Sequence, residues 1–590
     1  MLEQVSTKKL VFAARLADIK AAGCLALNLD GHALALFAQG DQVYAVDNRC
    51  PHMGFPLHRG SVKEGILTCH WHHARFDLAS GGTFDPWADD VTVFPTQLRG
   101  EDVWVDLDSQ VDGIAHHRKR LSDGLERNLS LVIAKAAINL HNRGVPPAEP
   151  FQIGLDFGVR YRQSGWGQGL TMLTCFINMM PQLHPEDRPR AVYHGLSAVA
   201  NDTESMPPRF MLQPLPGSPV SLETLKTWLR SFIEVRDSEG AERCVLSALE
   251  AGADTRQMAD MLFSAVTDHR YIQIGHPMDF TNKALEALDI AGWEYAAPVL
   301  TSLVAGYASA SRMEESNAWR HPIDLVEIEA RAFDLLPEAL NASRASQGKW
   351  NGGAGLLPVL LGDNPQDIAE GLLAALRQGC PAAELAGTVA YAAALRIAQF
   401  HTSNEFGDWD TALHTFTFAN AVHQGLRRSN TPELVRGVFD AAMSVYLDRF
   451  LNIPAARLPE PDGKQADAEK LLGELPALLN GQQQVNEAGA LIARYLFSGG
   501  HPEKLLAMLG RLLLREDRDF HTIQTMEAAM RQYSLLGNTP EGTIVLIAAG
   551  RYLAAHAPTV RAQGQTYQIA QRLSQGERLF DDDSRQDLSP

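Results

Sequence analysis

The sequence predicts a protein of two parts, in which a small antiparallel all-β domain is followed by a large all-α domain. Alternating apolar and polar residues run through residues 8–107, and apolar residues at helical spacing dominate from about residue 129 to residue 565. Two cysteines and five histidines are concentrated between Cys50 and Asp77, inside the β-patterned part. This concentration indicates a metal site in the smaller domain.

Composition and charge narrow the function. The chain has 590 residues, of which 45% are hydrophobic and 21% are charged, as in ordinary globular proteins. Its net charge of −18 argues against a nucleic-acid partner, because phosphate binding needs a basic surface. No apolar run reaches the ~20 residues of a membrane span, and the first residues, MLEQVSTKK, lack a signal-peptide pattern. We therefore predict a cytoplasmic protein.

The β domain is predicted over residues 1–107. Residues 24–48, CLALNLDGHALALFAQGDQVYAVDN, alternate apolar and polar side chains, with Asp-Gly and Gly-Asp where hairpin turns are expected. Residues 92–107, TVFPTQLRGEDVWVDL, predict two closing strands joined at Arg-Gly-Glu-Asp. Residues 108–128 are expected to be a linker and helix start, in which the basic run 116–120 is solvated.

The all-α domain is predicted over residues 129–565, and residues 566–590 are expected to be a frayed acidic tail. Residues 241–270 and 369–396 share a pattern of two apolar helices separated by a Gly-containing turn. Similar helices follow at 280–289, 414–423 and 521–530, and 194–202 resembles them. We interpret this as about four diverged helical repeats. Their uneven spacing favours a bundle or ring of helices over a solenoid.

The cysteine and histidine spacing identifies one metal site. Cys50-Pro51-His52 is a C-x-H pair, and Cys69 to His72 is a C-x-x-H pair. This pattern resembles the Rieske [2Fe–2S] domain, as do Gly54, Pro56, Leu57 and the pair Phe76-Asp77 after the two motifs. The resemblance implies that Cys50 and Cys69 hold one iron and that His52 and His72 hold the other. A zinc site is the alternative, but zinc fingers normally pair cysteine with cysteine.

Two departures favour the ferredoxin and oxygenase type within that family. The extra cysteines of the high-potential respiratory type are absent, and Ala74 and Phe76 stand where that type has hydroxyl groups. Fewer hydrogen bonds to the cluster sulfurs imply a low reduction potential. By spacing, His58, His70 and His73 are expected to be loop residues and not ligands.

A second metal site is predicted in the helical domain. Three of the repeats carry a histidine at the equivalent position: His194, His414 and His521. Equivalent positions in a bundle face a common axis, so we expect these three side chains to converge as the catalytic residues. Two more histidines, His276 and His401, lie near the equivalent positions and could supply further ligands to the same metal. Carboxylate partners could be Asp268, Asp279, Glu405 or Asp410. Such a set suits non-haem iron, manganese or zinc, although a histidine at a helix start can also simply cap that helix.

Two functions fit these observations. In the first, the chain is an oxidoreductase of the oxygenase kind, in which the cluster receives electrons from an external reductase or ferredoxin and the helical domain binds a small organic substrate. In the second, it is an electron-transfer or redox-sensing protein whose helical domain is a docking scaffold. No D-x-x-H-x₄₋₅-H motif follows residue 110, and no dinucleotide-binding fingerprint is present. The number of iron atoms per chain distinguishes the two.

Overall fold

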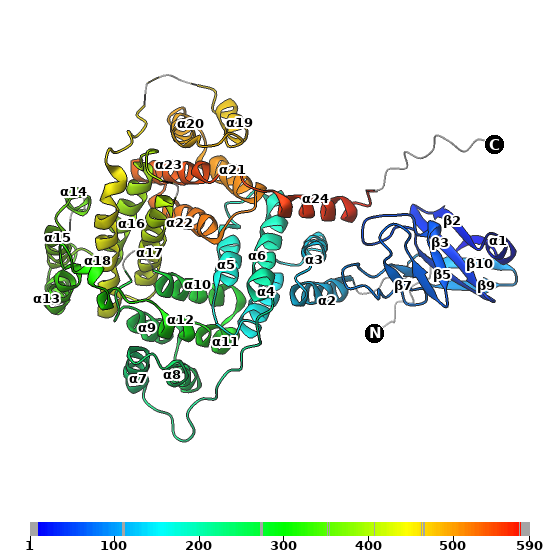
Figure 1. Ribbon diagram of the computed structural model, residues 1–590, viewed down its shortest axis with the longest axis horizontal. Helices are drawn as coiled ribbons and strands as arrows, with labels where there is room; N and C mark the ends of the chain where they lie inside the picture. The colour runs from blue at the N-terminus through cyan, green and yellow to red at the C-terminus, as the bar shows by residue number, and fades with distance from the viewer. Residues whose placement is uncertain are drawn as a thin grey trace. The chain divides into compact units, whose positions relative to one another are not determined.

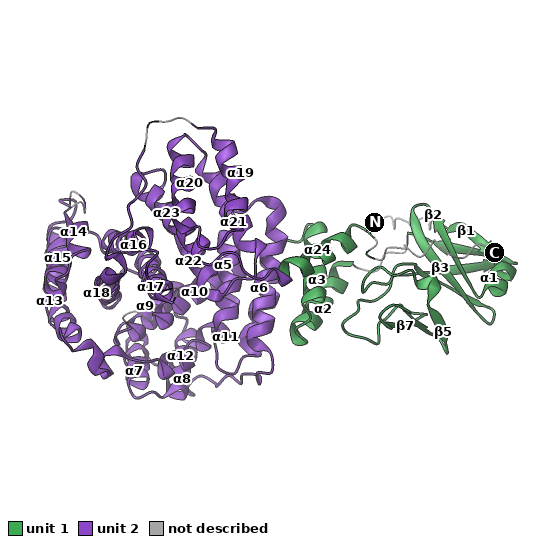
Figure 2. Cartoon of the chain, turned by 45° about the horizontal axis from the view of Figure 1, so that its top comes forward, with its two compact units in different colours: residues 1–146, 563–590 green, residues 147–562 purple. Residues whose placement is uncertain are grey.

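The computed structural model describes residues 10–108, 113–271, 275–350, 352, 355–405, 407–461, 463, 466–577 and 579. The chain forms two compact units, one of residues 1–146 with 563–590 and one of residues 147–562 (Figure 2). The predicted class, an antiparallel β domain followed by a large helical domain, is confirmed (Figure 1). Within the described residues no helix combines the length and the apolar character that crossing a membrane requires.

The β domain contains three antiparallel sheets, in the strand orders β1-β10-β9, β2-β3-β4-β8 and β5-β6-β7. The strands are β1 (Leu10–Arg15), β2 (Cys24–Leu29), β3 (His32–Gln39), β4 (Gln42–Asp47), β5 (Ser61–Lys63), β6 (Ile66–Thr68), β7 (Arg75–Asp77), β8 (Val93–Phe94), β9 (Thr96–Arg99) and β10 (Asp102–Asp106). The predicted hairpins form as expected, with Leu29 paired to His32 across Asp-Gly and Gln39 paired to Gln42 across Gly-Asp.

Four helices belong to the same unit as the sheets: α1 (Leu16–Ala22), α2 (Gly113–Glu126), α3 (Ser130–Asn142) and α24 (Ala562–Ser574). Helices α2 and α3 pack on each other as a hairpin. Residues 113–126, within the segment predicted as a linker and helix start, form a complete helix. The first residues of the predicted acidic tail belong to α24, and residues 578 and 580–590 lie outside the described part of the chain.

The helical unit contains α4 to α23. Their bounds are α4 (Ala148–Arg160), α5 (Gln168–Met179), α6 (Arg188–Thr203), α7 (Leu222–Glu234), α8 (Ser238–Glu250), α9 (Thr255–Val266), α10 (His276–Ala291), α11 (Ala296–Thr301), α12 (Val304–Ser309), α13 (Leu325–Ala345), α14 (Leu356–Leu360), α15 (Pro365–Arg377), α16 (Ala382–Ala398), α17 (Asp408–Arg428), α18 (Pro432–Leu447), α19 (Ala468–Leu478), α20 (Val485–Phe497), α21 (Pro502–Arg515), α22 (Phe520–Leu536) and α23 (Pro540–Ala555). The β domain holds one short 3₁₀ helix among the described residues, η1 (Leu57–Arg59), and the helical unit holds η2 (Pro185–Asp187), η3 (Trp293–Tyr295), η4 (Met313–Glu315), η5 (Asn317–Trp319) and η6 (Asp448–Asn452).

The centre of the helical unit is formed by α5, α10, α17 and α22, which lie among the other helices (Figure 1). These four helices are buried on most of their faces, whereas an outer helix such as α7 buries only Leu225, Leu229 and Ile233. A helix that is apolar around its whole circumference belongs in a core, so polar side chains on the central helices need partners there.

Candidate cluster site and histidine site

The two loops that carry the predicted cluster ligands project from the β domain. The first, residues 48–60, connects β4 to β5, and the second, residues 69–74, connects β6 to β7. Tight backbone hydrogen bonds close both loops, from Cys50 N to Phe55 O at 2.7 Å and from Cys69 N to Ala74 O at 2.8 Å. Gly54 adopts φ +81°, which a residue with a Cβ rarely takes, so the first loop turns where only glycine fits easily.

The four predicted ligands lie together at the ends of these loops. The thiols of Cys50 and Cys69 are buried and within hydrogen-bonding reach of each other. The imidazole rings of His52 and His72 lie 4.9 Å apart, centroid to centroid. Backbone N–H groups point at each sulfur, from residues 52 and 53 at Cys50 and from residues 71 and 72 at Cys69.

The chemistry of this donor set fits an iron–sulfur cluster. The Nδ1 atom of His52 is buried and has no hydrogen-bond partner among the described residues, as expected of an atom kept for a metal. Burial, reinforced by the charges of Lys135 and His72, lowers the pKa of His52 to about 4, so the ring is neutral at pH 7. The hydrogen bond from the Cys50 thiol lowers the pKa of Cys69, which favours the thiolate that binds metal.

The remaining histidines of the motif have other roles. His58 exchanges hydrogen bonds with Asn48, and the Nε2 atom of His70 lies 3.0 Å from the Ser61 hydroxyl. His73 is exposed in a left-handed turn with φ +62°. The spacing predicts exposed loop residues at all three positions; His70 and His73 are exposed, whereas His58 is half-buried.

Helices α2 and α3 pack against the cluster loops, which the sequence reasoning missed. Lys135 of α3 is only 6% exposed, and its Nζ donates to the carbonyl oxygens of Pro51 and, at 3.2 Å, His52. Burial lowers the pKa of Lys135 to about 8, which leaves the ammonium the main form at pH 7. The signal in the sequence was a lone lysine inside the apolar stretch LVIAKAAINL.

A second contact fixes the segment that follows the cluster loops. The Trp87 ring lies edge-on against the His52 ring, at 4.7 Å between centroids. Arg120 of α2 donates to the carbonyl oxygens of Pro86 and Ala88, at 3.0 and 2.8 Å, and its Nε lies 2.9 Å from Asp89 Oδ1. The prediction that the basic run 116–120 is solvated is therefore wrong at Arg120, which is 5% exposed.

Three histidines converge in the helical unit from three different central helices. His276 begins α10, His414 lies in the second turn of α17, and His521 lies in the first turn of α22. One ring nitrogen from each can be chosen so that all three lie within 4.8 Å of one another. The ring centroids are 5.1 Å apart for His276 and His414, 5.8 Å for His276 and His521, and 4.7 Å for His414 and His521. We call these residues the histidine triad.

The surroundings of the triad resemble those of a metal site. Asp279 is 1% exposed, its Oδ2 lies 3.3 Å from His276 Nδ1, and its Oδ1 has no partner among the described residues. The Nε2 atom of His521 likewise has no partner there. Burial lowers the pKa of His521 to about 4 and also lowers the pKa of His414, whereas Asp279 raises the pKa of His276 against the effect of burial.

Two of the predicted ligands lie away from this triad. His194 is buried within α6, where its ring contacts Phe176 and Tyr193, and His401 lies after α16 with its Nδ1 atom 2.7 Å from the Ser403 hydroxyl. Neither side chain belongs to the histidine triad, whose ring nitrogens lie within 4.8 Å of one another. The expectation that His194 completes the set was wrong, because α6 packs on α4, α5 and α21, whereas the triad lies on α10, α17 and α22. His276 takes the third position.

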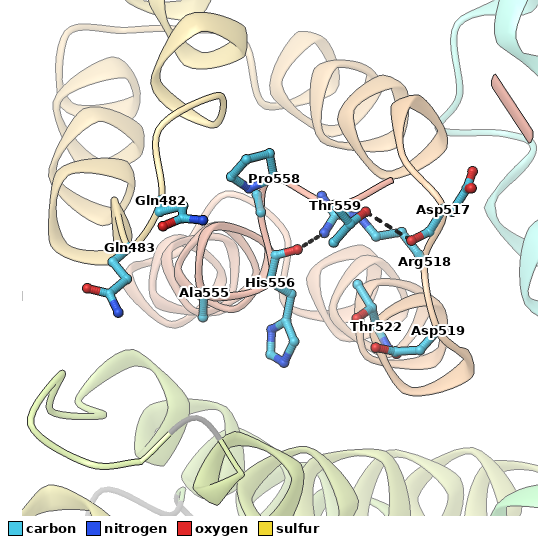
Figure 3. A pocket seen from close by; sticks show the side chains of 11 residues that line it. Gln482, Gln483, Asp517, Arg518, Asp519, Thr522, Ala555, His556, Pro558 and Thr559 are labelled. Carbon is cyan, nitrogen blue, oxygen red and sulfur yellow. Dashed lines mark hydrogen bonds between the residues drawn. The ribbon is translucent and has the colours of Figure 1, made fainter. Parts of the chain in front are cut away.

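A cavity of about 340 Å³ lies beside the same end of α22. Figure 3 shows His556, Thr522 and Asp519 among its lining side chains. Asp519 is the N-cap of α22, and Thr522 directly follows His521 in the chain. The His556 ring stacks on Tyr552 at 4.3 Å between centroids. The polar cavity and the histidine triad therefore share the N-terminal turn of one helix.

Comparison with known proteins identifies the smaller domain. Residues 9–95 match the family model of the Rieske [2Fe-2S] domain. The ferredoxin component of the naphthalene 1,2-dioxygenase system of Pseudomonas aeruginosa is 28% identical over 102 residues, which is 17% of this chain and 98% of the relative. The ferredoxin subunit of the 3-phenylpropionate/cinnamic acid dioxygenase of Escherichia coli (strain K12) is 28% identical over 99 residues, 16% of this chain and 92% of the relative.

Among solved structures, the ferredoxin of carbazole 1,9a-dioxygenase from Nocardioides aromaticivorans IC177 is 28% identical and covers 16% of this chain and 96% of its own, with a TM-score of 0.16. The family match makes residues 9–95 a Rieske [2Fe–2S] domain, and its sequence relatives show that it resembles the ferredoxin components of oxygenase systems. These three matches each cover less than a fifth of the chain, and the role of the helical unit is not shown by them.

Proposed function

We propose that the chain is an oxidoreductase of the oxygenase kind. The Rieske cluster would supply single electrons to a metal held by the histidine triad, and dioxygen would take up these electrons and oxidise a small organic substrate. A non-haem iron is the metal best suited to oxygenase chemistry, and manganese and zinc share its preference for imidazole. The electrons come from an external reductase or ferredoxin, since the sequence carries no dinucleotide-binding fingerprint. The observation that carries the proposal is the convergence of His276, His414 and His521 from three central helices.

Each protein group around the triad has a role in this proposal. Asp279 accepts a hydrogen bond from the Nδ1 atom of His276, which orients the ring and leaves its other nitrogen for the metal. The rings of Phe280 and Phe520 lie 5.2 and 5.5 Å from the ring of His276, so they limit the access of water. The cavity lined by Thr522 and His556 is the space that we propose for the substrate.

A second candidate is an electron carrier or redox sensor whose helical unit is a docking scaffold. The observation that favours it is the nature of the relatives, because two of them are named as ferredoxin components and match along more than nine-tenths of their own length. In this case the triad would hold no metal, and the cluster would pass its electron to another protein.

The ratio of metal to acid-labile sulfide separates the two candidates. A [2Fe–2S] cluster alone gives two metal atoms for two sulfides, whereas a loaded triad adds a third metal atom. We expect His414→Ala and His521→Ala to return the ratio to that of the cluster alone, because losing one of three ligands removes most of the affinity. His401→Ala is the matched control and should keep the third atom. A wild-type protein with no metal beyond the cluster, after reconstitution with Fe²⁺, would contradict the oxygenase proposal.

A further inference from the structure

Lys135 stands out because it is a buried lysine aimed at the loop that carries two cluster ligands. It belongs to α3, which lies beyond the end of the family match at residue 95. Its Nζ donates to the carbonyl oxygens of Pro51 and His52, and in the described part of the chain its hydrogen bonds go to no carboxylate. Asp89 contributes negative charge nearby, but it is held by Arg120 and His116. The charge of Lys135 is thus not neutralised by a direct ion pair.

We propose that Lys135 raises the reduction potential of the Rieske cluster and positions the His52 loop. Reduction adds one electron to the cluster from an external reductant, so the reduced cluster is one unit more negative than the oxidised one. A cation buried beside the first loop stabilises the more negative state. The two hydrogen bonds also withdraw electron density from the peptide groups that flank the His52 ligand, in the same direction.

The size of the effect follows from Coulomb's law. A unit charge ~10 Å from the added electron, at an effective dielectric constant of ~20, changes the reduction equilibrium by about tenfold. For a one-electron couple, tenfold corresponds to about 59 mV. Removing the charge should therefore lower the potential by about that amount, while the cluster remains bound by its four ligands.

Three substitutions separate charge from packing. Lys135→Met removes the ammonium and keeps an unbranched side chain of similar length. Lys135→Gln removes the charge and keeps a hydrogen-bond donor, whereas Lys135→Arg keeps both. Lys119→Met on the exposed face of α2 is the matched control, because it removes one lysine from the same hairpin at a position open to solvent.

The measurement is a potentiometric titration of the full-length protein with dithionite, followed by electron paramagnetic resonance of the reduced cluster. We expect a fall of about tenfold in the reduction equilibrium for the Met and Gln variants and an unchanged potential for Arg and for Lys119→Met. A potential that stays the same in Lys135→Met with full cluster content overturns the proposal. So does an equal fall in Lys119→Met, which would indicate a general charge effect. Loss of the cluster from a folded Lys135→Gln protein would instead assign Lys135 a purely structural role.

Discussion

Replacing Lys283 by methionine should destabilise the helical unit by about 3–5 kcal/mol, the usual cost of leaving a buried charge without its partner. Lys283 is 2% exposed, and its Nζ lies 2.8 Å from Glu286 Oε2 and 2.7 Å from Glu527 Oε2. Arg531 completes the set, with its Nη2 2.6 Å from Glu286 Oε1. Two cations thus balance two carboxylates, and the single variant leaves both carboxylates facing one guanidinium.

The assay is urea unfolding followed by far-ultraviolet circular dichroism. At a slope of about 3 kcal/mol per molar urea, a loss of 3–5 kcal/mol moves the midpoint by about 1 M or more. The double variant Lys283→Met/Glu527→Gln restores neutrality by leaving one carboxylate with one guanidinium, so it should recover a large part of the loss. Lys504, which pairs with Glu469 on the surface, provides the control, and Lys504→Met should leave the midpoint unchanged.

Two results would refute this reasoning. A loss below about 1 kcal/mol in the single variant would mean that water reaches the network or that the carboxylates take up protons at little cost. A double variant less stable than the single one would show that packing, and not charge balance, sets the cost. An unchanged slope is needed for either comparison, because a changed slope signals a different unfolded state or an intermediate.

Four further substitutions test other parts of the molecule. Ala74 and Phe76 lie in the core beside the cluster cysteines. Ala74→Ser and Phe76→Tyr should each raise the reduction potential of the cluster, because the new hydroxyl groups can donate hydrogen bonds to the cluster sulfurs. If neither variant shows a higher potential in a redox titration, the loops do not bring these side chains to the sulfurs. Burial, reinforced by the neighbouring Asp440, raises the pKa of Glu329 far above its usual range. The protonated Glu329 therefore adds to the free energy of unfolding below pH ~4.3, and this contribution is lost as the pH rises toward the pKa of the folded state. Glu329→Gln should flatten this part of the pH profile of unfolding, and an identical profile would contradict the assignment. Asp279→Asn should weaken metal binding at the triad by about 10–100-fold in a metal titration, and unchanged affinity would remove Asp279 from the site.

The cluster site was predictable from the sequence because its determinants are local. Each ligand pair lies within one loop, and dipeptides such as Asp-Gly fix the hairpins that hold those loops. The packing of α2 and α3 on the loops is not local, so the run 116–120 looked like a solvated linker. The lone Lys135 in an apolar stretch was the available signal, because a fully buried helix face tolerates an ammonium only with partners.

The histidine triad was only partly predictable. Matching helical segments placed His414 and His521 at corresponding positions near helix starts, and the structure brings them together. The same matching selected His194, but α6 packs on α4, α5 and α21 and so does not bring this ring to the triad. Which helix supplies the third imidazole depends on how α10, α17 and α22 pack, and these contacts join residues more than a hundred positions apart. Pattern matching along a single chain does not contain that information.

The triad and the buried charge network lie on the same central helices, and this proximity connects stability to the proposed metal site. Lys283 follows His276 by seven residues on α10, about 10 Å along the helix, and Glu527 follows His521 on α22. Their ion pair therefore opposes sliding of α10 along α22. A slip of one turn, about 5.4 Å, would separate His276 from His521 by more than any shared metal allows. Lys283→Met should then weaken metal binding at the triad without touching a ligand, whereas Lys504→Met should not. Equal metal affinity in the two variants would show that the triad is held by its own neighbours, such as Asp279, and not by the register of the helices.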